Sequence, residues 1–569
     1  MATLSDVSPN VLQKVTSAIL TEAGVDLTDI HCSKSTAFRK MKLANENIST
    51  LAKEDVKKAI EASPYPCIIH FDGKTLYEIN AGKKFKIDRL AVLVNIEGET
   101  QLLGVPPLTS SSGEDQYTSV MNVLKEYKLE SKVGGLCFDT TASNTGIKKG
   151  SVVKISNNLN KYLLKLACRH HITELRMVHF WKHTTNKLST GPENPLFQKF
   201  KSLFEHPNLI YSPSDLCKFD WSEVNGSISE KAAEDSMNFC KAYIERKGIV
   251  GEDKREDRRE LAELVVTYLS PSIKYKIRKT GAIHHAHFLA KAIYYLKMQL
   301  LYSQLDLVQE NNDLKMEIKL IAEFVACFYA KWYLESSNVS KAPNLDMKAI
   351  HQMRQFRNIC LNPKAVDAVL DSLYKHTWYL DSTMIPLALL DEDLPLNEKQ
   401  KIAVAILSFK MPRAEHFKNE NKEKKDIRKE IEKNASTEKD PPSLAPLVDE
   451  FSYLMFSFCG LTEERIKDWL SLPPQYWHTQ SSFKIFENYA NSLIVINDHS
   501  ERAVGMMQQY VHRYNNEEEK QNRLISVDRV RSAFRISGKS STSLTKKRLS
   551  DSLSSLAKKQ NTNKQRRIN

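Results

Sequence analysis

The hydrophobic period of the sequence changes twice along the chain, and this limits the available folds more than any other feature. Between residues 64 and 139 short apolar runs alternate with turn residues. The runs typical of strands are YPCIIHFDGKTL, KFKIDRLAVLVNI, TQLLGVPPL and, after the amphipathic helix pattern DQYTSVMNVLKEYKL, VGGLCFD. A helical stretch follows Gly146, and YLLKLACRHHITEL comes next. Three strands, a helix, a strand and another helix predict an α/β layer with a mixed sheet.

Helical patterns flank this layer on both sides. Residues 1–60 predict a small helical region, and residues 181–445 contain long helical patterns with wide apolar faces and few strand signals. Residues 418–440 are charge-dense and precede two prolines, which predicts a solvated helix or linker. Helices are expected again over 446–530. The predicted fold class is therefore α/β plus all-α, with the boundaries 1–60, 64–180, 181–445, 446–530 and 531–569.

The N-terminal region contains a possible DNA-binding element. The segment VLQKVTSAILTEAG has helical spacing, and Gly24 is a suitable stop. Ser33 or Ser35 then caps a short helix that carries Arg39 and Lys40. This pattern is typical of the second helix of a helix-turn-helix, whose basic and small polar side chains face a DNA groove. An ordinary basic surface helix is the alternative.

Most of the charge excess lies near the C-terminus. The formal charge is +13, and residues 536–569 contain nine Lys or Arg and one Asp. Such a tail, expected to be disordered from residue 531, suits a nuclear import signal or a phosphate-binding arm, or is simply a solvated end.

Hydropathy and cysteine usage argue against a membrane protein, a secreted protein and a protein built on disulfides or zinc fingers. No apolar run reaches the ~20 residues of a membrane span, and the first residues lack a secretory pattern, so we expect an intracellular protein without a membrane partner. Nine cysteines without a CxxC pair argue against a disulfide framework and against a zinc finger, and they predict buried thiols.

Acidic residues follow two of the predicted strands. CIIHFD ends on Asp72 and GGLCFD ends on Asp139. Carboxylates at the carboxyl ends of neighbouring strands repel one another unless a hard cation lies between them, so the pair predicts a Mg²⁺ or Mn²⁺ site. Glu501, in NDHSERAV at the start of an apolar helix, is the candidate third acid, and Asp498 is the alternative. Strand-end aspartates are also common turn residues.

Four motifs in order resemble those of hAT-superfamily DNA transposases. FDTTASNTG is similar to the family's second-aspartate motif, ACRHH to its CxxH motif, and NDHSERAVGMM to its late Glu-Arg motif, and a helical block separates the last two. The first aspartate lacks the nearby Trp of many members, Arg502 is followed by AVGM, and the N-terminus has no Cys/His finger pattern. The resemblance is therefore to a divergent or domesticated member.

The resemblance implies an RNase H-like DDE fold whose mixed sheet is split by a helical insertion. Asp72, Asp139 and Glu501 would then hold two Mg²⁺ or Mn²⁺ ions for phosphoryl transfer. Cys168 and His171 would shape DNA near the cleavage site, since two ligands alone make no closed zinc site. A buried thiol and a satisfied core histidine are the alternatives for this pair.

The sequence allows two kinds of role for three further side chains. Arg502, Arg169 and His170 would contact DNA or, alternatively, pair with acids or pack internally. Asn144 is expected to brace the turn after Asp139 through its side chain.

Two functions follow. The first is a transposase or transposase-derived protein that cuts and joins DNA in the nucleus, and a metal-dependent nuclease would use the same site. The second is a non-catalytic DNA-binding or scaffold protein that keeps the fold. The family also implies a homo-oligomer, a dimer or larger.

Overall fold

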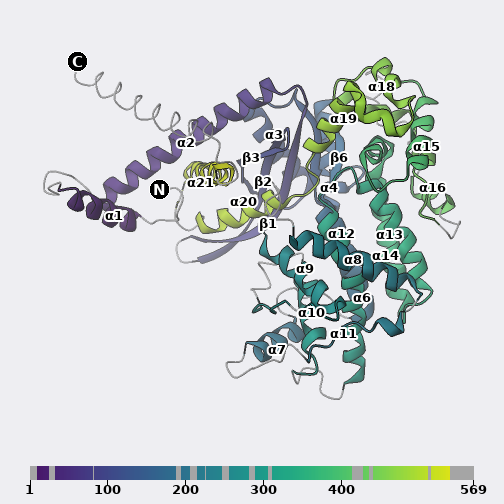
Figure 1. The fold of residues 1–569 in the computed structure, drawn as a ribbon. Helices are drawn as coiled ribbons and strands as arrows, with labels where there is room; N and C mark the ends of the chain where they lie inside the picture. The colour runs from purple at the N-terminus through teal and green to yellow at the C-terminus, as the bar shows by residue number, and fades with distance from the viewer. Residues whose placement is uncertain are drawn as a thin grey trace. The chain divides into compact units, whose positions relative to one another are not determined.

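The fold comes from a computed structural model, which describes residues 9–24, 33–80, 83–186, 194–205, 215–224, 226–245, 255–273, 275–280, 289–304, 311–412, 427–434, 440–510, 514 and 516–537. These residues are mainly helical and include a six-stranded mixed sheet, so the coarse fold class is confirmed. They form two compact units (Figure 1). The first unit lies within 1–133, 142–159 and 498–569, and the second within 134–141 and 160–497.

The sheet combines antiparallel and parallel pairs. Its order is β3-β2-β1-β5-β6, and β4 also pairs with β2. Strands β1, β2, β3 and β4 pair antiparallel, whereas β5 and β6 run parallel. The bounds are β1 Cys67–Asn80, β2 Lys83–Ile96, β3 Glu99–Gly104, β4 Pro107–Leu108, β5 Val133–Phe138 and β6 Leu164–Ala167.

The expectation that the first strand ends at Asp72 is wrong. β1 continues to Asn80, and its register with β2 is unbroken through Asp72↔Ala91, Gly73↔Leu90 and Leu76↔Ile87. Gly73 therefore lies in the extended ladder and forms no turn. The residues that follow it add a second half to the hairpin, in which Leu76 is buried.

Strand β6 is an addition to the predicted strands. Its sequence LKLA is only four residues long and leads within two residues into α6 Arg169–Thr185. It pairs with β5 in the register Gly135↔Leu164 to Phe138↔Ala167. Short helices α4 Ala142–Thr145 and α5 Ser151–Leu159 lie between these two strands in the sequence.

The first unit contains helices from both ends of the chain. Helix α1 Pro9–Glu22 is followed by Gly24, whose φ of +72° is the left-handed conformation expected of a helix stop. Ser33 caps α2 Lys34–Ala62 as predicted, because its Oγ accepts a hydrogen bond from the Thr36 N–H at 3.1 Å. The remaining helices of this unit are α4 and α5, together with α3 Gly113–Tyr127, α20 Asp498–Tyr510 and α21 Glu517–Ser537.

Helix α2 corrects the expected short helix. It is a single helix of 29 residues, and one face is buried along its length. This face packs on α21 (Figure 1). Arg39 and Lys40 lie on the exposed side. The buried residues recur every three or four positions: Ala37, Met41, Asn45, Ser49, Ala52, Val56 and Ile60. Because α21 continues to Ser537, the tail expected from residue 531 begins no earlier than 538, and residues 538–569 lie outside the described part.

A buried arginine joins the hairpin to α21. Arg89 of β2 is 1% exposed and contacts Glu78 of β1 at 2.6 Å and Glu517 of α21 at 2.8 Å. Its Nη1 also donates to the Val105 carbonyl at 3.0 Å. Lys520 adds a second cation, whose Nζ lies 3.0 Å from Glu78 Oε2. The network compensates every charge that the hairpin buries here.

The second unit is helical apart from its strand segments. None of its described residues between 181 and 445 forms a strand, as expected. Its helices after α6 are α7 Pro195–Phe204, α8 Ile228–Glu245, α9 Glu256–Leu269, α10 Ala290–Leu301, α11 Asn312–Phe324, α12 Ala330–Glu335, α13 Ala342–Arg357, α14 Pro363–His376, α15 Leu396–Leu407, α16 Ile427–Asn434, α17 Tyr453–Phe458, α18 Glu463–Leu470 and α19 Ser481–Ser492. A π-helical turn, Val325–Tyr329, joins α11 to α12.

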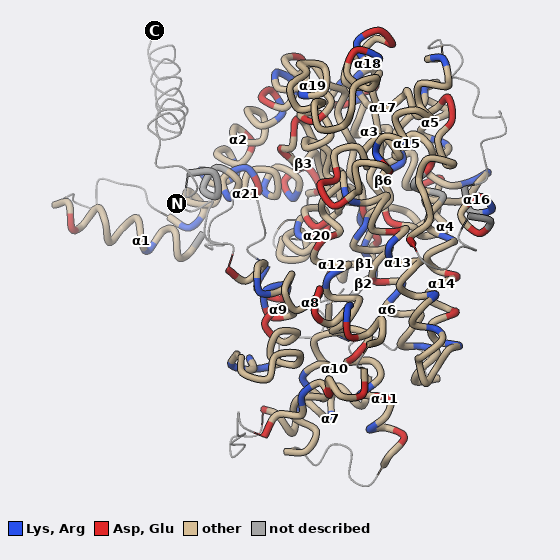
Figure 2. Tube along the Cα trace, turned by 45° about the vertical axis from the view of Figure 1, so that its right-hand side comes forward, with Lys and Arg blue, Asp and Glu red and all other residues tan. Residues whose placement is uncertain are grey.

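Charged residues of both signs are spread over the described helices. Figure 2 shows Lys and Arg interspersed with Asp and Glu along them. Within the charge-dense segment 418–440, α16 buries Ile431, so this part is a packed helix and not only a linker.

None of the eight described cysteines forms a disulfide, and six are buried. No helix among the described residues has both the length and the apolar character needed to cross a bilayer.

The Arg89 network generates a stability prediction. Arg89→Met should lower the free energy of unfolding by about 3 kcal/mol, because Glu78 would stay buried with one cation fewer. Chemical denaturation measures the loss. The control Lys132→Met changes an exposed side chain and should shift the free energy by less than about 0.5 kcal/mol. Equal stability of the two variants would contradict the role given to the network.

Candidate functional site

Asp139 follows a fully buried strand, as predicted. All six residues of β5 are buried, and the next residue, Asp139, is half-buried. Its Oδ1 accepts hydrogen bonds from the Thr141 N–H at 3.0 Å and the Thr141 hydroxyl at 2.6 Å. These bonds make Asp139 a turn residue, which was the alternative to a metal ligand. They use two of roughly four acceptor positions of a carboxylate, so the turn and a ligand role are compatible.

The residues after this turn fold tightly. Asn144 is buried, and its Oδ1 accepts a hydrogen bond from the Ser151 hydroxyl at 2.7 Å, so its side chain ties α4 to the start of α5. Its expected bracing of the turn after Asp139 stays a prediction. The Gly150 N–H donates to the Gly146 carbonyl at 2.7 Å. A Cβ at Gly150 would lie 2.5 Å from the carbonyl oxygens of Asn144 and Gly146, so only glycine fits there.

The CxxH motif joins two other segments through its backbone. The Cys168 N–H donates to the carbonyl of Phe138, the residue before Asp139, at 2.7 Å. The Arg169 N–H donates to the Val495 carbonyl at 2.9 Å. Residues 138, 168–169 and 495 are far apart in the sequence, and these bonds hold them side by side in the second unit. We call this arrangement the 138–168–495 junction.

A buried ion triad anchors this junction. Arg169 binds Asp346 of α13 through two bonds, Nη1 to Oδ2 at 2.7 Å and Nη2 to Oδ1 at 2.8 Å. Arg176, two turns further along α6, donates to Asp346 Oδ1 at 2.6 Å. All three side chains are buried. Of the two roles considered for Arg169, pairing with an acid is therefore the one observed.

The charge state of Asp346 follows from its neighbours. Burial by itself would raise the pKa of Asp346, but the guanidinium groups of Arg169 and Arg176 outweigh burial and lower this pKa to about 2. The carboxylate is thus ionised at neutral pH.

The two histidines of the motif differ in their surroundings. His170 is buried, and its ring stacks on Tyr333 with centroids 4.3 Å apart. Its Nδ1 lies 3.2 Å from the Arg258 guanidinium. His170 is therefore an internal packing residue. His171 is half-exposed, and the Cys168 thiol is buried. A role for Cys168 and His171 toward DNA stays a prediction.

Asp72 and Glu501 both belong to the first unit. Directly paired residues of an antiparallel ladder project from one face, so Asp72 shares its face with its partner Ala91. Ala91 lies in a buried cluster with Ala503 and Val504 of α20. Helix α20 therefore covers the face from which Asp72 projects (Figure 1). Glu501 lies in the first turn of this helix, as predicted, and is half-exposed.

A side-chain amide fixes how α20 lies along β1. Gln508 Nε2 donates to the Tyr77 carbonyl at 3.0 Å, and its Oε1 accepts from the Tyr77 N–H at 3.3 Å. Glu501 precedes Gln508 in the helix, and Asp72 precedes Tyr77 in the strand. Arg502, the neighbour of Glu501, is exposed.

The candidate metal ligands are distributed over both units. Asp72 and Glu501 belong to the first unit, and Asp139 to the second. Within the described residues, no group of three or more His, Cys, Asp or Glu is gathered as a metal site. Carboxylate oxygens are nevertheless the donors that Mg²⁺ and Mn²⁺ prefer, so the chemistry of the three acids fits these ions.

Sequence reasoning missed Asp346 and Arg176, although a signal was present. Arg176 lies at helical spacing between Ile172 and Phe180, and Asp346 lies four residues before Ile350. A charged residue within an apolar helix stripe predicts a buried partner of opposite sign.

Comparisons with known proteins assign no family, since no family model matches the chain and no curated protein matches its sequence.

The ion triad predicts a pH-dependent stability. Asp346→Asn should lower the free energy of unfolding at pH 7 by about 3–5 kcal/mol, because the guanidinium groups of Arg169 and Arg176 would stay buried without the carboxylate that pairs with them. In the wild type, the lowered pKa of about 2 makes this stabilisation complete above the unfolded pKa near 4, and it is lost as the pH falls toward 2. Denaturant unfolding of both proteins should show their difference shrinking by about 2.5 kcal/mol over this window. A difference independent of pH would contradict the triad.

Proposed function

We propose that this protein is a hAT-like transposase, or a protein derived from one, that cuts and joins DNA by metal-dependent phosphoryl transfer. The observation that carries the proposal is the 138–168–495 junction. It brings together the backbone beside three of the motifs that resemble the family: the second aspartate, the CxxH motif and the segment that leads to the late glutamate.

The first unit adds support from the position of α20. This helix packs on the face of the hairpin that carries Asp72, and Glu501 lies in its first turn. A role shared by Asp72, Asp139 and Glu501 accounts for three half-buried acids on a strand, after a strand and at a helix start.

The three carboxylates would hold Mg²⁺ or Mn²⁺. The ions would supply a lowered pKa for an attacking water or 3′-hydroxyl and stabilise the leaving oxygen of an in-line displacement. The protein's own part is orientation. Thr141 fixes the rotamer of Asp139 through two hydrogen bonds, and Gln508 fixes the register of the helix that carries Glu501. No covalent protein nucleophile is required.

DNA, as the proposed partner, would be contacted by cations that remain at the surface. Arg502 next to Glu501 and the exposed Arg39 and Lys40 of α2 are the candidates within the described residues, together with His171. The basic segment 536–569 suits phosphate binding and nuclear import. A dimer or larger homo-oligomer belongs to the same proposal.

Strand cleavage tests the catalytic role directly. Wild-type protein with Mn²⁺ should cleave a hairpin-forming or terminal-repeat DNA substrate, and Asp139→Asn should reduce the rate at least about a hundredfold, because one metal ligand is lost. Asp72→Asn and Glu501→Gln should behave alike. Asp371→Asn, an exposed acid on α14, should retain the wild-type rate. Equal rates for Asp139→Asn and Asp371→Asn would remove the assignment.

Metal binding has a readout that does not require activity. Mn²⁺ at about a hundredfold excess over its dissociation constant should stabilise the folded wild type by about 2.7 kcal/mol. The stabilisation should vanish in Asp139→Asn and persist in Asp371→Asn, as measured by thermal unfolding with and without EDTA. Salt-sensitive DNA binding without any metal response would favour the non-catalytic scaffold instead.

A further inference from the structure

Side chains of neighbouring elements form hydrogen bonds with the backbone of a short basic segment in the second unit. Residues 275–280 follow α9 without forming a helix or a strand, and the Tyr275 N–H donates to the Thr267 hydroxyl of that helix at 3.0 Å. Lys297 of α10 is fully buried, and its Nζ donates to the Arg278 carbonyl at 2.9 Å. Its charge is balanced by Glu260 at 2.7 Å.

A second lysine holds the residues that precede this segment. The Lys218 Nζ donates to the carbonyls of Ser270 at 2.6 Å and Pro271 at 3.0 Å. The Trp221 indole N–H donates to the Leu269 carbonyl at 2.9 Å. Residues 269–273 and 275–279 are thus held by side chains of residues 215–224, α9 and α10, so the backbone that carries their side chains is fixed.

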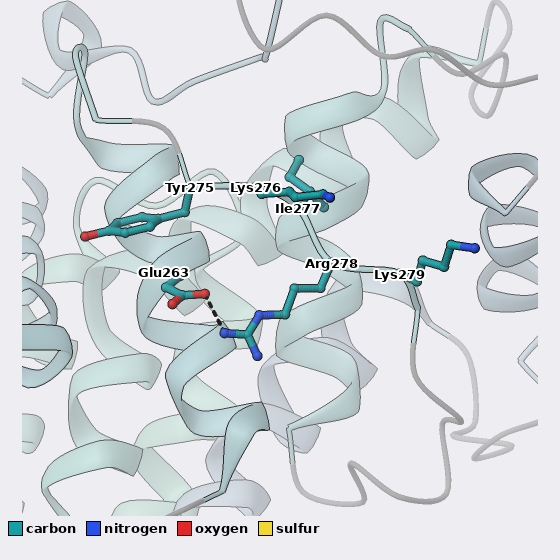
Figure 3. A pocket seen from close by; sticks show the side chains of 6 residues that line it. All are labelled: Glu263, Tyr275, Lys276, Ile277, Arg278 and Lys279. Atoms are coloured by element: carbon teal, nitrogen blue, oxygen red, sulfur yellow. Dashed lines mark hydrogen bonds and ion pairs between the residues drawn. The ribbon is translucent and has the colours of Figure 1, made fainter.

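This segment lines a pocket of about 550 Å³. Arg278 closes one wall by pairing with Glu263 at 2.9 Å, and it also lies 3.4 Å from Glu256. Figure 3 shows the Tyr275 ring and the Lys279 side chain on opposite sides of the Glu263–Arg278 pair. The lining residues are Glu263, Tyr275, Lys276, Ile277, Arg278 and Lys279.

The cations available to a ligand are the two lysines. Arg278 pairs with two carboxylates, Glu263 and Glu256, so its role is to hold the wall. Lys276 and Lys279 are exposed, and neither side chain forms an ion pair or hydrogen bond with any residue that the structure describes. Lys276 and Lys279 are three residues apart, so their Cα atoms lie at most about 10 Å from each other, and both ammonium groups can reach phosphates of one strand.

We propose that this pocket binds single-stranded nucleic acid, with a base stacked on Tyr275 and phosphates on Lys276 and Lys279. Aromatic rings interleaved with basic side chains are the combination that proteins use for single strands. The held backbone lowers the ordering cost of binding. The inference rests on the proposed function only in taking nucleic acid as the partner, since no cleavage or metal is involved.

The test is binding of a labelled oligo(dT) of about 12 nucleotides to the full chain in EDTA, followed by fluorescence anisotropy. Tyr275→Leu should weaken binding about tenfold, whereas Tyr275→Phe, which keeps the ring, should bind like wild type. Lys276→Glu/Lys279→Glu should reduce the slope of log affinity against log salt by about 1.4, which is the loss of two single-strand phosphate contacts.

Controls separate this site from general charge effects. Lys364→Glu/Lys484→Glu reverses two exposed lysines on α14 and α19 and should leave affinity and slope nearly unchanged. Thermal unfolding should show that all variants are folded. Equal binding by Tyr275→Leu and Tyr275→Phe, equal slopes for the two double variants, or polyaspartate competing as well as oligo(dT) would each overturn the proposal. None of these outcomes depends on Asp139, so the proposed catalysis succeeds or fails separately.

Discussion

Asp346 lies between two buried guanidinium groups, and the candidate site depends on this contact. Arg169 cannot leave the interior without abandoning a carboxylate whose pKa is held at about 2. Because the Arg169 N–H bonds to Val495 and the neighbouring Cys168 N–H to Phe138, the position of its side chain also fixes two other segments. A helical segment that carries no family motif thus determines where the backbone beside Asp139 lies.

Buried cationic side chains donate hydrogen bonds to backbone carbonyls at more than one place in this chain. Arg89 reaches the Val105 carbonyl, and Lys297 reaches the Arg278 carbonyl. Each is paired with a carboxylate, Arg89 with Glu78 and Lys297 with Glu260, so the desolvation cost of a buried ion is offset by a charge partner and by a hydrogen bond to a backbone carbonyl. Such contacts fix the position of segments without regular hydrogen bonding, which include residues 275–280.

Local signals predicted the parts of the fold that local physics determines. Ser33 and Gly24 act through their own backbone neighbours, and both were identified correctly. The length of β1 was not, because only the register with β2 shows that Asp72 lies within the strand. The length of α2 depends on α21, which is more than 450 residues away in the sequence. The partner of Arg169 was out of reach for the same reason, since Asp346 follows it by 177 positions.

The distinction between buried and exposed cations also changes how the net charge is interpreted. Removing the tail's +8 from the total of +13 leaves +5 for residues 1–535, and several of their arginines and lysines are committed to internal carboxylates and carbonyls. The summed charge attracts a polyanion at long range, but direct contact requires a cation that remains near the surface and lacks an internal partner. Lys276 and Lys279 meet this condition beside an aromatic ring, whereas Arg169, although it lies within a motif, does not. Burial and pairing, and not position in a motif, therefore decide which basic residues are candidates for contact with nucleic acid.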